Sequence, residues 1–296
     1  MQTKRNAIIM AAGTSSRFVP LSEEYPKGLL NVRGEILIDR QIRQLQEAGI
    51  NDITIVVGFM SSMFSYLKDK FCVDIVMNED YNRFNNVSSI YRVLDRLDNT
   101  FICSSDNYFP NNIFNKYSTE SFYCAQYATG NTDEYCFDID DKGYIQDVKV
   151  SGENSWYMIG PAFFNYDFSS RFREIMLKEY TMLETKQMYW EDIYIKHISE
   201  LRMRVEKFGP NDLFEFDSLD ELRSFDITYQ DNTRSNIIRK IATELSCPEH
   251  VLHSFKRINI KEKRLAFSFK KEDVSYEYID GVIAKINENS SNISGT

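Results

Sequence analysis

Two basic residues, Arg17 and Lys27, follow a short apolar stretch near the start of the chain. A run of small residues separates that stretch from Arg17. Small residues let the backbone come close to a phosphate group, and backbone N–H groups can then point at the anion. Arginine adds a forked donor and lysine a compact charge. The pattern predicts a loop that binds an anionic polyphosphate, formed by Ala11, Ala12, Gly13, Thr14, Ser15 and Ser16.

The loop does not match the common nucleotide-binding signatures. The P-loop pattern G-x-x-x-x-G-K-[ST] is absent, and Gly13 alone does not make a dinucleotide-binding fingerprint. A second feature is Asp106, near the end of an apolar stretch at 100–107. A carboxylate at the carboxyl edge of a parallel sheet can hold Mg²⁺ between nucleotide phosphates. The two features together indicate a site for a nucleoside triphosphate and a metal ion.

Alternating strands and helices must position these residues. Short buried runs are followed by segments with helical spacing of apolar residues, which predicts a mostly parallel sheet with helices on both faces. The carboxyl ends of such strands form the usual ligand-binding edge. The predicted strands are 7–10, 52–58, 73–78 and 100–107, and the predicted helices are 36–49, 63–71 and 86–97.

The second half of the chain has a different pattern. It predicts strands at 122–128, 155–164 and 203–208, a hairpin at 135–150 turning at 141–143, and helices at 168–180 and 189–201. The expected fold class is α/β, with a Rossmann-like, mixed but mostly parallel sheet flanked by helices.

A polar, turn-rich stretch at 225–236 predicts a domain boundary. We expect a main domain at 1–225 and a small α+β C-terminal appendage at 226–296. The appendage is predicted to hold a helix at 235–245 and a hairpin at 264–281. Its polar end, 287–296, is expected to be disordered.

Composition excludes several classes of protein. The 296 residues carry a net charge of −9, which argues against a general nucleic-acid binder but allows a small anionic ligand in a local basic pocket. The five cysteines are odd in number and widely spaced without a C-x-x-C pair, which suggests neither a zinc site nor a disulfide framework. No apolar run is long enough to insert in a membrane. We expect a cytoplasmic protein with small-molecule partners, and a homodimer stays open.

Several motifs carry a resemblance to known enzymes. The stretches AAGTSSRF, YPKGLL, VVG and SSDN resemble nucleotidyltransferases of the GT-A-like fold, a group that includes sugar-nucleotide pyrophosphorylases. The stretches GINDITIVVGF, NNVSSIY, SSDNYFPNN, YWEDIYIKHI and FEFDSLDELR are similar to bacterial CTP:phosphocholine cytidylyltransferases. This resemblance covers about residues 5–225. The appendage faintly resembles the first lobe of bacterial choline kinases, without the glycines expected there and without a kinase catalytic segment.

The resemblance implies roles for individual residues. Residues 11–16 should wrap the nucleotide, with Arg17 near the β- and γ-phosphates of CTP and Lys27 near the α-phosphate. Asp106 should be one ligand of Mg²⁺, and the second should be Glu191 or Asp192. The base or ribose should contact Asn86, Ser88 and Ser89; Asn86 alone would also suit a helix N-cap.

The implied acceptor pocket departs from the family. Quaternary ammonium groups are held by aromatic faces, and the phosphocholine enzymes use a tryptophan where this chain has Tyr135 beside Glu134. The side chains that could complete an aromatic box are Trp156, Tyr189 and Trp190. A weaker aromatic residue with nearby acids also suits a primary ammonium, so phosphoethanolamine and 2-aminoethylphosphonate stay open beside phosphocholine, which ranks first.

The expected reaction is transfer of CMP from CTP to such an acceptor, activating a head group for a surface glycan or lipid. Two alternatives remain at this point: a sugar-1-phosphate nucleotidyltransferase, and a non-catalytic domain that binds CTP and regulates a partner.

Overall fold

The computed structural model describes residues 4–116, 118–260 and 265–286. The chain forms two compact units. The first comprises Met1–Gly13 and Glu35–Glu215, and the second comprises Thr14–Gly34 and Phe216–Thr296. The division thus differs from the boundary predicted after residue 225, because residues 14–34 fold with the C-terminal part of the chain. The predicted disorder of 287–296 concerns a stretch outside the described residues.

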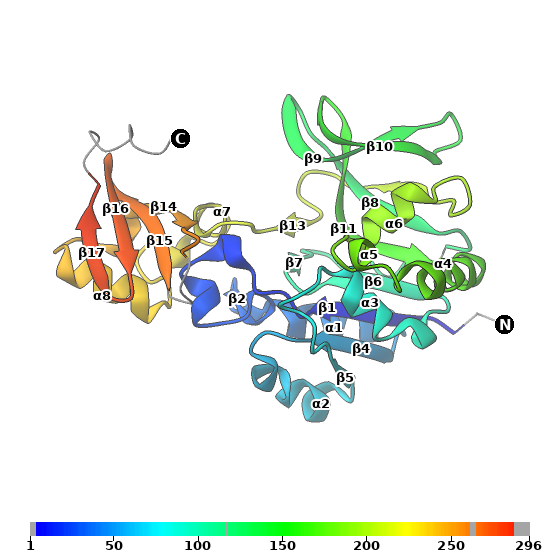
Figure 1. The fold of residues 1–296 in the computed structure, drawn as a ribbon, viewed down its shortest axis with the longest axis horizontal. Coiled ribbons are helices and arrows are strands. Elements are labelled where there is room, and N and C mark those ends of the chain that lie inside the picture. Colours follow the sequence, from blue (N-terminus) through cyan, green and yellow to red (C-terminus); the bar gives the residue numbers. More distant parts are fainter. Residues whose placement is uncertain (1–3, 117, 261–264, 287–296) are drawn as a thin grey trace. The chain divides into compact units, whose positions relative to one another are not determined.

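The parallel half of the first unit contains four strands in the order β6, β1, β4, β5 (Figure 1). Their apolar residues are buried, as expected for parallel strands covered by helices; Ala7, Ile8 and Ile9 are fully buried. The strands are β1 Asn6–Ala11, β4 Asp52–Val57, β5 Asp74–Met77 and β6 Thr100–Ser104. The helices of this half are α1 Leu37–Glu47, α2 Tyr66–Phe71 and α3 Val87–Tyr91.

The other half of the sheet is mostly antiparallel. β11 Trp156–Phe164 pairs antiparallel with β6 and with β8 Phe122–Tyr127, and β12 Arg204–Lys207 runs parallel to β8. The predicted hairpin is present as β9 Asn131–Ile139 and β10 Ile145–Glu153. The helices are α4 Tyr166–Glu179, α5 Leu183–Lys186 and α6 Trp190–Lys196. A mixed sheet flanked by helices confirms the predicted fold class.

Three very short strands complete the first unit. β7 Asn107–Tyr108 follows β6 after a tight turn and pairs antiparallel with β13 Phe214–Glu215. β3 Glu35–Ile36 leads directly into α1. The β7–β13 pair matters for the site because it joins the segment after Asp106 to a segment far along the chain.

The second unit contains a four-stranded antiparallel meander (Figure 1). Phe255, Phe267 and Phe269 form its apolar face, and Tyr278 stacks on Phe267 with ring centroids 4.7 Å apart. The helices are α7 Leu219–Phe225 and α8 Asn236–Glu244. The strands are β2 Asn31–Val32, β14 Leu252–Arg257, β15 Ala266–Lys271, β16 Val274–Ile279 and β17 Val282–Lys285.

An aromatic core stabilises the antiparallel half of the first unit. Trp190 is 1% exposed and packs edge-on to Phe164, at 5.3 Å between ring centroids, and to Phe172, at 6.3 Å. Truncating a buried aromatic residue to alanine typically costs about 3–5 kcal/mol. Trp190 therefore fixes the start of α6, where two of the candidate site residues lie.

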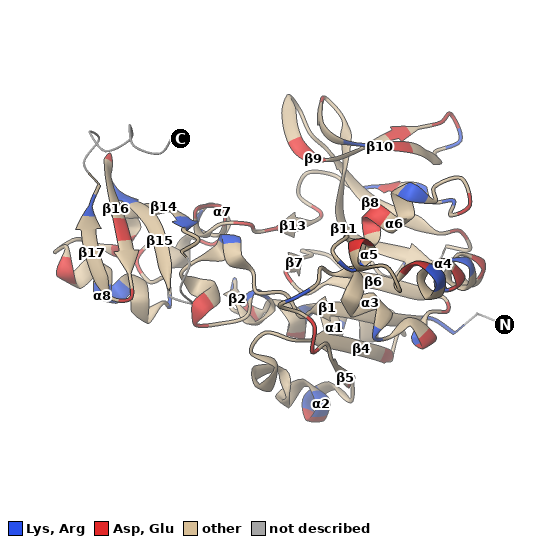
Figure 2. Cartoon of the chain, viewed as in Figure 1, with Lys and Arg blue, Asp and Glu red and all other residues tan. Residues whose placement is uncertain are grey.

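Charged residues are distributed over both units. Figure 2 shows Lys and Arg interspersed with Asp and Glu along most elements. Within the described residues, no helix combines the length and the apolar character that a membrane span requires.

Candidate active site

The first part of the predicted loop is held at the end of β1. The carbonyl of Ala12 accepts a hydrogen bond from the Phe59 backbone N–H at 3.1 Å. A Cβ at Gly58 would lie 2.8 Å from that carbonyl and 2.6 Å from Cβ of Tyr81, so only glycine allows this approach. Ala11 and Ala12 are buried, whereas Gly13 is exposed, with open space where a Cβ would lie. Residues 11–13 thus form a firm edge that ends in accessible backbone.

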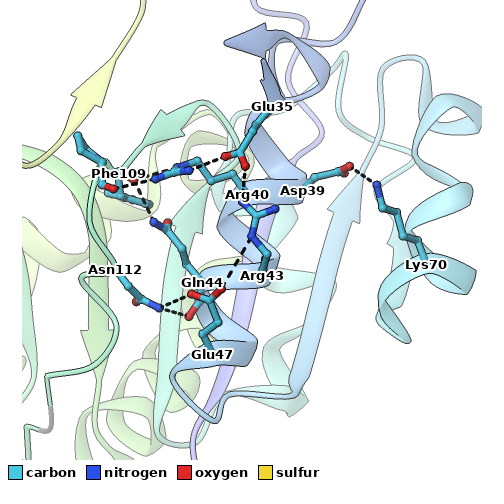
Figure 3. Close-up of polar contacts among 10 residues, drawn as sticks. Glu35, Asp39, Arg40, Arg43, Gln44, Glu47, Lys70, Phe109 and Asn112 are labelled. Carbon is cyan, nitrogen blue, oxygen red and sulfur yellow. Dashed lines mark hydrogen bonds and ion pairs between the residues drawn. The ribbon is translucent and has the colours of Figure 1, made fainter. Parts of the chain in front are cut away.

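Helix α1 makes hydrogen bonds on both sides of the turn that carries Asp106. Figure 3 shows the contacts of Arg40 and Gln44 with Phe109 on the far side. On the side of β6, Gln41 donates from Nε2 to the carbonyl of Ser104 at 3.0 Å. On the far side, Arg40 donates from Nε to the carbonyl of Phe109 at 3.0 Å. Asp106 lies between these two anchor points in the sequence, so α1 limits how far its backbone can move.

More bonds from α1 reinforce the far anchor. Arg40 Nη2 donates to the Pro110 carbonyl at 2.8 Å, and Gln44 Nε2 donates to the Phe109 carbonyl at 3.0 Å. The Arg40 guanidinium also lies 4.8 Å from the centroid of the Tyr108 ring and pairs with Glu35. These buried carbonyls would lose their partners if α1 moved, and an unpaired buried polar group is costly.

Glu191, at the start of α6, lies among hydrogen-bond donors. Its carboxylate accepts from Asn86 Nδ2 at 3.3 Å and from the Tyr123 hydroxyl at 3.2 Å. Burial outweighs these bonds and raises the pKa of Glu191 to about 7. A carboxyl group in this position is ready to gain a cationic partner.

Asp192 is the second acid of this pair. Its Oδ2 accepts from the Tyr189 backbone N–H at 2.8 Å, which caps α6, and its Oδ1 accepts from the Tyr135 hydroxyl at 3.3 Å. Burial and then the charge of Asp192 raise the pKa of Tyr135. The structure therefore brings Tyr135, Tyr189, Glu191 and Asp192 together, four residues that the sequence singled out.

A further tyrosine and two more acids extend this group. Burial, followed by the charges of Glu134 and Glu215, raises the pKa of Tyr157. Glu215 also accepts from Asn107 Nδ2 at 3.1 Å and lies opposite Asn107 in the β7–β13 pair. We call the eight residues of this group the tyrosine–acid cluster; they are Tyr123, Tyr135, Tyr157, Tyr189, Glu134, Glu191, Asp192 and Glu215.

Sequence reasoning missed three members of the cluster: Tyr123, Tyr157 and Glu215. A signal existed for Glu215, because the motif FEFDSLDELR contains it. Tyr123 and Tyr157 lie on buried strands, where tyrosine usually serves packing.

Ser88 and Ser89, which were predicted to contact the nucleotide, have side chains that bond inside the protein. Their residues are 0% and 3% exposed, and both hydroxyls accept hydrogen bonds from Asn78 Nδ2, at 2.9 and 3.1 Å. The two hydroxyls thus form hydrogen bonds in the protein interior. Asn86 bridges to α6 instead, because its Oδ1 accepts from the Trp190 backbone N–H at 2.8 Å.

The two tryptophans predicted for the acceptor pocket, Trp190 and Trp156, both pack against other aromatic rings. Trp190 is buried and stacks on Tyr123 at 5.6 Å between ring centroids, so its face is not open to an acceptor. Trp156 packs edge-on to Tyr127 at 5.4 Å, and the Lys207 ammonium lies 4.8 Å from the Trp156 ring centroid. The aromatic residues that gather with the acids are tyrosines.

The rest of the predicted loop belongs to the second unit. Ser15 has a left-handed backbone (φ 49°), and Arg17 lies in a short 3-10 helix, Ser16–Phe18, that follows it. Arg17 Nη1 lies 2.9 Å from Oδ2 of Asp217, and Lys27 Nζ lies 3.3 Å from Oδ1 of the same carboxylate. The Arg17 side chain is 76% exposed, whereas that of Lys27 is 7% exposed. Both predicted phosphate ligands thus converge on one anion, and sequence reasoning did not assign Asp217.

A Mg²⁺ site needs few protein ligands, because the ion usually binds one or two carboxylates together with substrate phosphates. In the described stretches, no three His, Cys, Asp or Glu side chains gather as a metal-binding group. Asp106, on its anchored turn next to β7, fits the role of a single carboxylate ligand.

The chain is similar to several known proteins. A family model described as the MobA-like NTP transferase domain matches residues 7–126. A 2-aminoethylphosphonate cytidylyltransferase from Lancefieldella rimae is 35% identical over 230 residues, which are 76% of this chain and 94% of that protein. A choline-phosphate cytidylyltransferase from Streptococcus pneumoniae is 34% identical over 220 residues, 74% of this chain and 96% of that protein. The solved structure of the CTP:phosphocholine cytidylyltransferase from Streptococcus pneumoniae superposes with a TM-score of 0.73, covering 76% of this chain and 99% of that one.

Proposed function

The chain belongs to the cytidylyltransferase family of nucleotidyltransferases, and on this premise we propose that it transfers CMP from CTP to a small amino-alcohol phosphate or phosphonate. The observation that carries the choice of acceptor is the tyrosine–acid cluster. Carboxylates such as Glu191 and Asp192 lie beside tyrosine rings there. Anions and aromatic rings are the two partners that an ammonium group seeks.

The chemical step needs positioning and charge stabilisation rather than a protein nucleophile. An oxygen of the acceptor phosphate or phosphonate forms a bond to the α-phosphorus of CTP. At the same time, the bond from that phosphorus to the bridging oxygen of pyrophosphate breaks. The attacking oxygen is ionised at neutral pH, so no base has to remove a proton. The rate enhancement comes from holding the two reactants in line and from stabilising the charge that develops in the transition state.

Arg17 and Lys27 are proposed to bind the phosphates of CTP. Arg17, which is exposed, would contact the β- and γ-phosphates with its forked donors. Lys27, which is largely buried, would stabilise the charge that develops at the α-phosphate, where low dielectric strengthens its effect. Asp217 pairs with both cations in the structure and would share them with the incoming phosphates. Backbone N–H groups of residues 11–16 would add further donors.

Mg²⁺ is proposed as the metal, with Asp106 as a ligand. When bound, the ion supplies charge neutralisation for the phosphates and for the departing pyrophosphate. Glu191 and Asp192 remain the candidates for a second ligand. Their carboxylates already accept hydrogen bonds from Tyr123 and Tyr135. Those contacts also suit the acceptor ammonium, so we assign the pair first to the acceptor.

The proposed acceptor pocket consists of Tyr135 and Tyr189 with the acids Glu134, Glu191 and Asp192. Hydroxyl and carboxylate oxygens suit the N–H donors of a primary ammonium, whereas ring faces suit a trimethylammonium. Trp190 is buried, so the pocket is proposed with tyrosine rings rather than with the face of Trp190. Phosphoethanolamine and 2-aminoethylphosphonate are therefore candidate acceptors on an equal footing with phosphocholine. The odd number and wide spacing of the cysteines lead us to propose a cytoplasmic enzyme.

The test is release of pyrophosphate with CTP, Mg²⁺ and a panel of acceptors. The panel contains phosphocholine, phosphoethanolamine, 2-aminoethylphosphonate and several sugar 1-phosphates, each repeated with ATP, UTP and GTP. Release with CTP and one amino-alcohol compound supports the proposal and names the head group. Release with sugar phosphates alone would refute the acceptor class. CTP binding without turnover on any acceptor would instead indicate a regulatory domain.

A further inference from the structure

Residues 14–34 of the second unit carry Arg17 and Lys27, and we call this longer segment the nucleotide-binding loop from here on; it has little regular structure of its own. Apart from the short strand β2, its backbone forms 3-10 turns at Ser16–Phe18, Leu21–Glu23 and Lys27–Leu29. Such turns close only local hydrogen bonds. The shape of the loop, and hence the placement of Arg17 and Lys27, must come from contacts with other parts of the unit.

The first contact is between Glu24 and the start of α8. The Glu24 carboxylate accepts from the backbone N–H of Asn236 at 2.8 Å and of Ile237 at 3.5 Å, and from the Ser235 hydroxyl. The two N–H groups lie at the N-terminus of α8, where backbone donors have no partner within the helix and negative charge is favoured. The neighbouring residue, Glu23, forms an ion pair with Arg257 of β14. The middle of the loop is thus attached to the appendage by two consecutive acids.

The second contact is at the end of the loop. The carbonyl of Asn31 accepts from the Tyr229 hydroxyl at 2.9 Å and from the Arg234 guanidinium. Two residues later, the Arg33 backbone N–H donates to Oδ2 of Asp226 at 2.7 Å. All three partners lie between 226 and 234, the polar stretch that reads as a linker in the sequence.

These contacts give a role to the part of the chain after residue 225, where the resemblance to the cytidylyltransferases ends. We propose that residues 226–257 position the nucleotide-binding loop, so that Arg17 and Lys27 are held where the phosphates of CTP bind. This inference rests on the proposed function. It needs no kinase activity from the appendage, although the appendage resembles part of a kinase.

The experiment uses the full-length protein with Glu24→Gln. The amide places an N–H₂ group among the N–H donors of Ser235, Asn236 and Ile237, so the contact breaks. We expect the KM for CTP to rise on the order of tenfold, the scale of one lost charge-assisted hydrogen bond. The KM for the acceptor should stay within about twofold, because the acceptor does not bind the loop. The matched control is Lys240→Ala, an exposed position on α8, which should behave as wild type.

A double-mutant cycle separates positioning from general destabilisation. Ser235→Ala should raise the KM for CTP less than Glu24→Gln, and the double variant should lose no more than Glu24→Gln alone. If Glu24→Gln fails to fold, Tyr229→Phe, which removes only one hydroxyl, tests the other contact through the same selective rise in the KM for CTP.

An active wild type whose Glu24→Gln and Tyr229→Phe variants keep the wild-type KM for CTP would overturn the positioning role. A parallel loss of acceptor affinity in these variants would also overturn it. A wild type that releases no pyrophosphate with any acceptor refutes the proposed function instead. In that case CTP affinity, measured by calorimetry on the same variants, still decides the positioning role.

Discussion

We expect Arg40 to contribute both to the stability of the first unit and to the dependence of the reaction rate on Mg²⁺ concentration. Its guanidinium donates to the carbonyls of Phe109 and Pro110 at 3.0 and 2.8 Å, and its side chain is only 17% exposed. Hydrogen bonds from charged groups contribute about 1.5–3 kcal/mol each. Gln44 still reaches the Phe109 carbonyl in the variant, and water can enter the space left by the side chain. We therefore expect Arg40→Ala to lower the free energy of unfolding by about 3 kcal/mol.

The effect on catalysis follows from the position of Asp106. The far anchor of its turn weakens in Arg40→Ala, while Gln41 still holds the near one. A misplacement of about 1 Å in a catalytic group can cost on the order of a hundredfold in rate. We expect kcat to fall by about tenfold to a hundredfold and the Mg²⁺ concentration for half-maximal rate to rise.

The assays are urea denaturation and a Mg²⁺ titration of pyrophosphate release. Arg43→Ala is the matched control on the same helix, because Arg43 is 45% exposed and forms ion pairs only with Glu35 and Glu47 among the described residues. Exposed ion pairs contribute about 1 kcal/mol or less. Arg40→Lys should be intermediate. An Arg40→Ala variant that loses stability but keeps the wild-type Mg²⁺ dependence would show that the turn does not depend on this anchor.

Three further predictions concern the proposed site. Lys27→Ala should lower kcat by about a hundredfold or more, and a change in the KM for CTP alone would contradict its role at the α-phosphate. Tyr135→Trp should shift kcat/KM from phosphoethanolamine toward phosphocholine, because tryptophan has the stronger cation–π face and lacks the hydroxyl that donates to Asp192; an unchanged ratio would remove Tyr135 from the pocket. Glu191→Gln should change the pH dependence of stability. Burial raises the pKa of Glu191 from 4.5 to about 7, so the folded state favours the neutral acid. The wild type therefore loses up to about 3 kcal/mol as the pH rises from 4.5 through 7, and the variant, measured in urea at pH 5 and pH 8 without metal, should not.

Most regular elements could be predicted from the spacing of apolar residues. The strands and helices of 7–107 and the β9–β10 hairpin follow the periods of two and 3.6 residues, which depend on local sequence. The helix predicted at 86–97 is shorter in the structure than expected: α3 ends at Tyr91, and a 3-10 turn at Leu94–Arg96 follows. β7 and β13 are two residues each and carry no periodic signal.

Long-range contacts account for what the sequence did not reveal. The association of residues 14–34 with the C-terminal part depends on pairs such as Glu24 and Asn236, which no local pattern indicates. The directions in which side chains point could not be predicted from the sequence either. Ser88 and Ser89 have the right spacing for a ligand contact, but Asn78 draws their hydroxyls inward. The motif that contains Glu215 and Asp217 was visible, although the partners of these acids were not.

The proposed activity of this chain is the joining of CMP to an amino-alcohol phosphate or phosphonate. The most direct measurement is ³¹P NMR of a reaction that contains the enzyme, CTP, Mg²⁺ and each acceptor in turn, with Asp106→Ala as the comparison. We predict new resonances from a CMP–acceptor product with one amino-alcohol compound, together with pyrophosphate, and neither with Asp106→Ala. A wild type that forms a linked product only with sugar 1-phosphates, or that leaves CTP intact with every acceptor, would contradict the account.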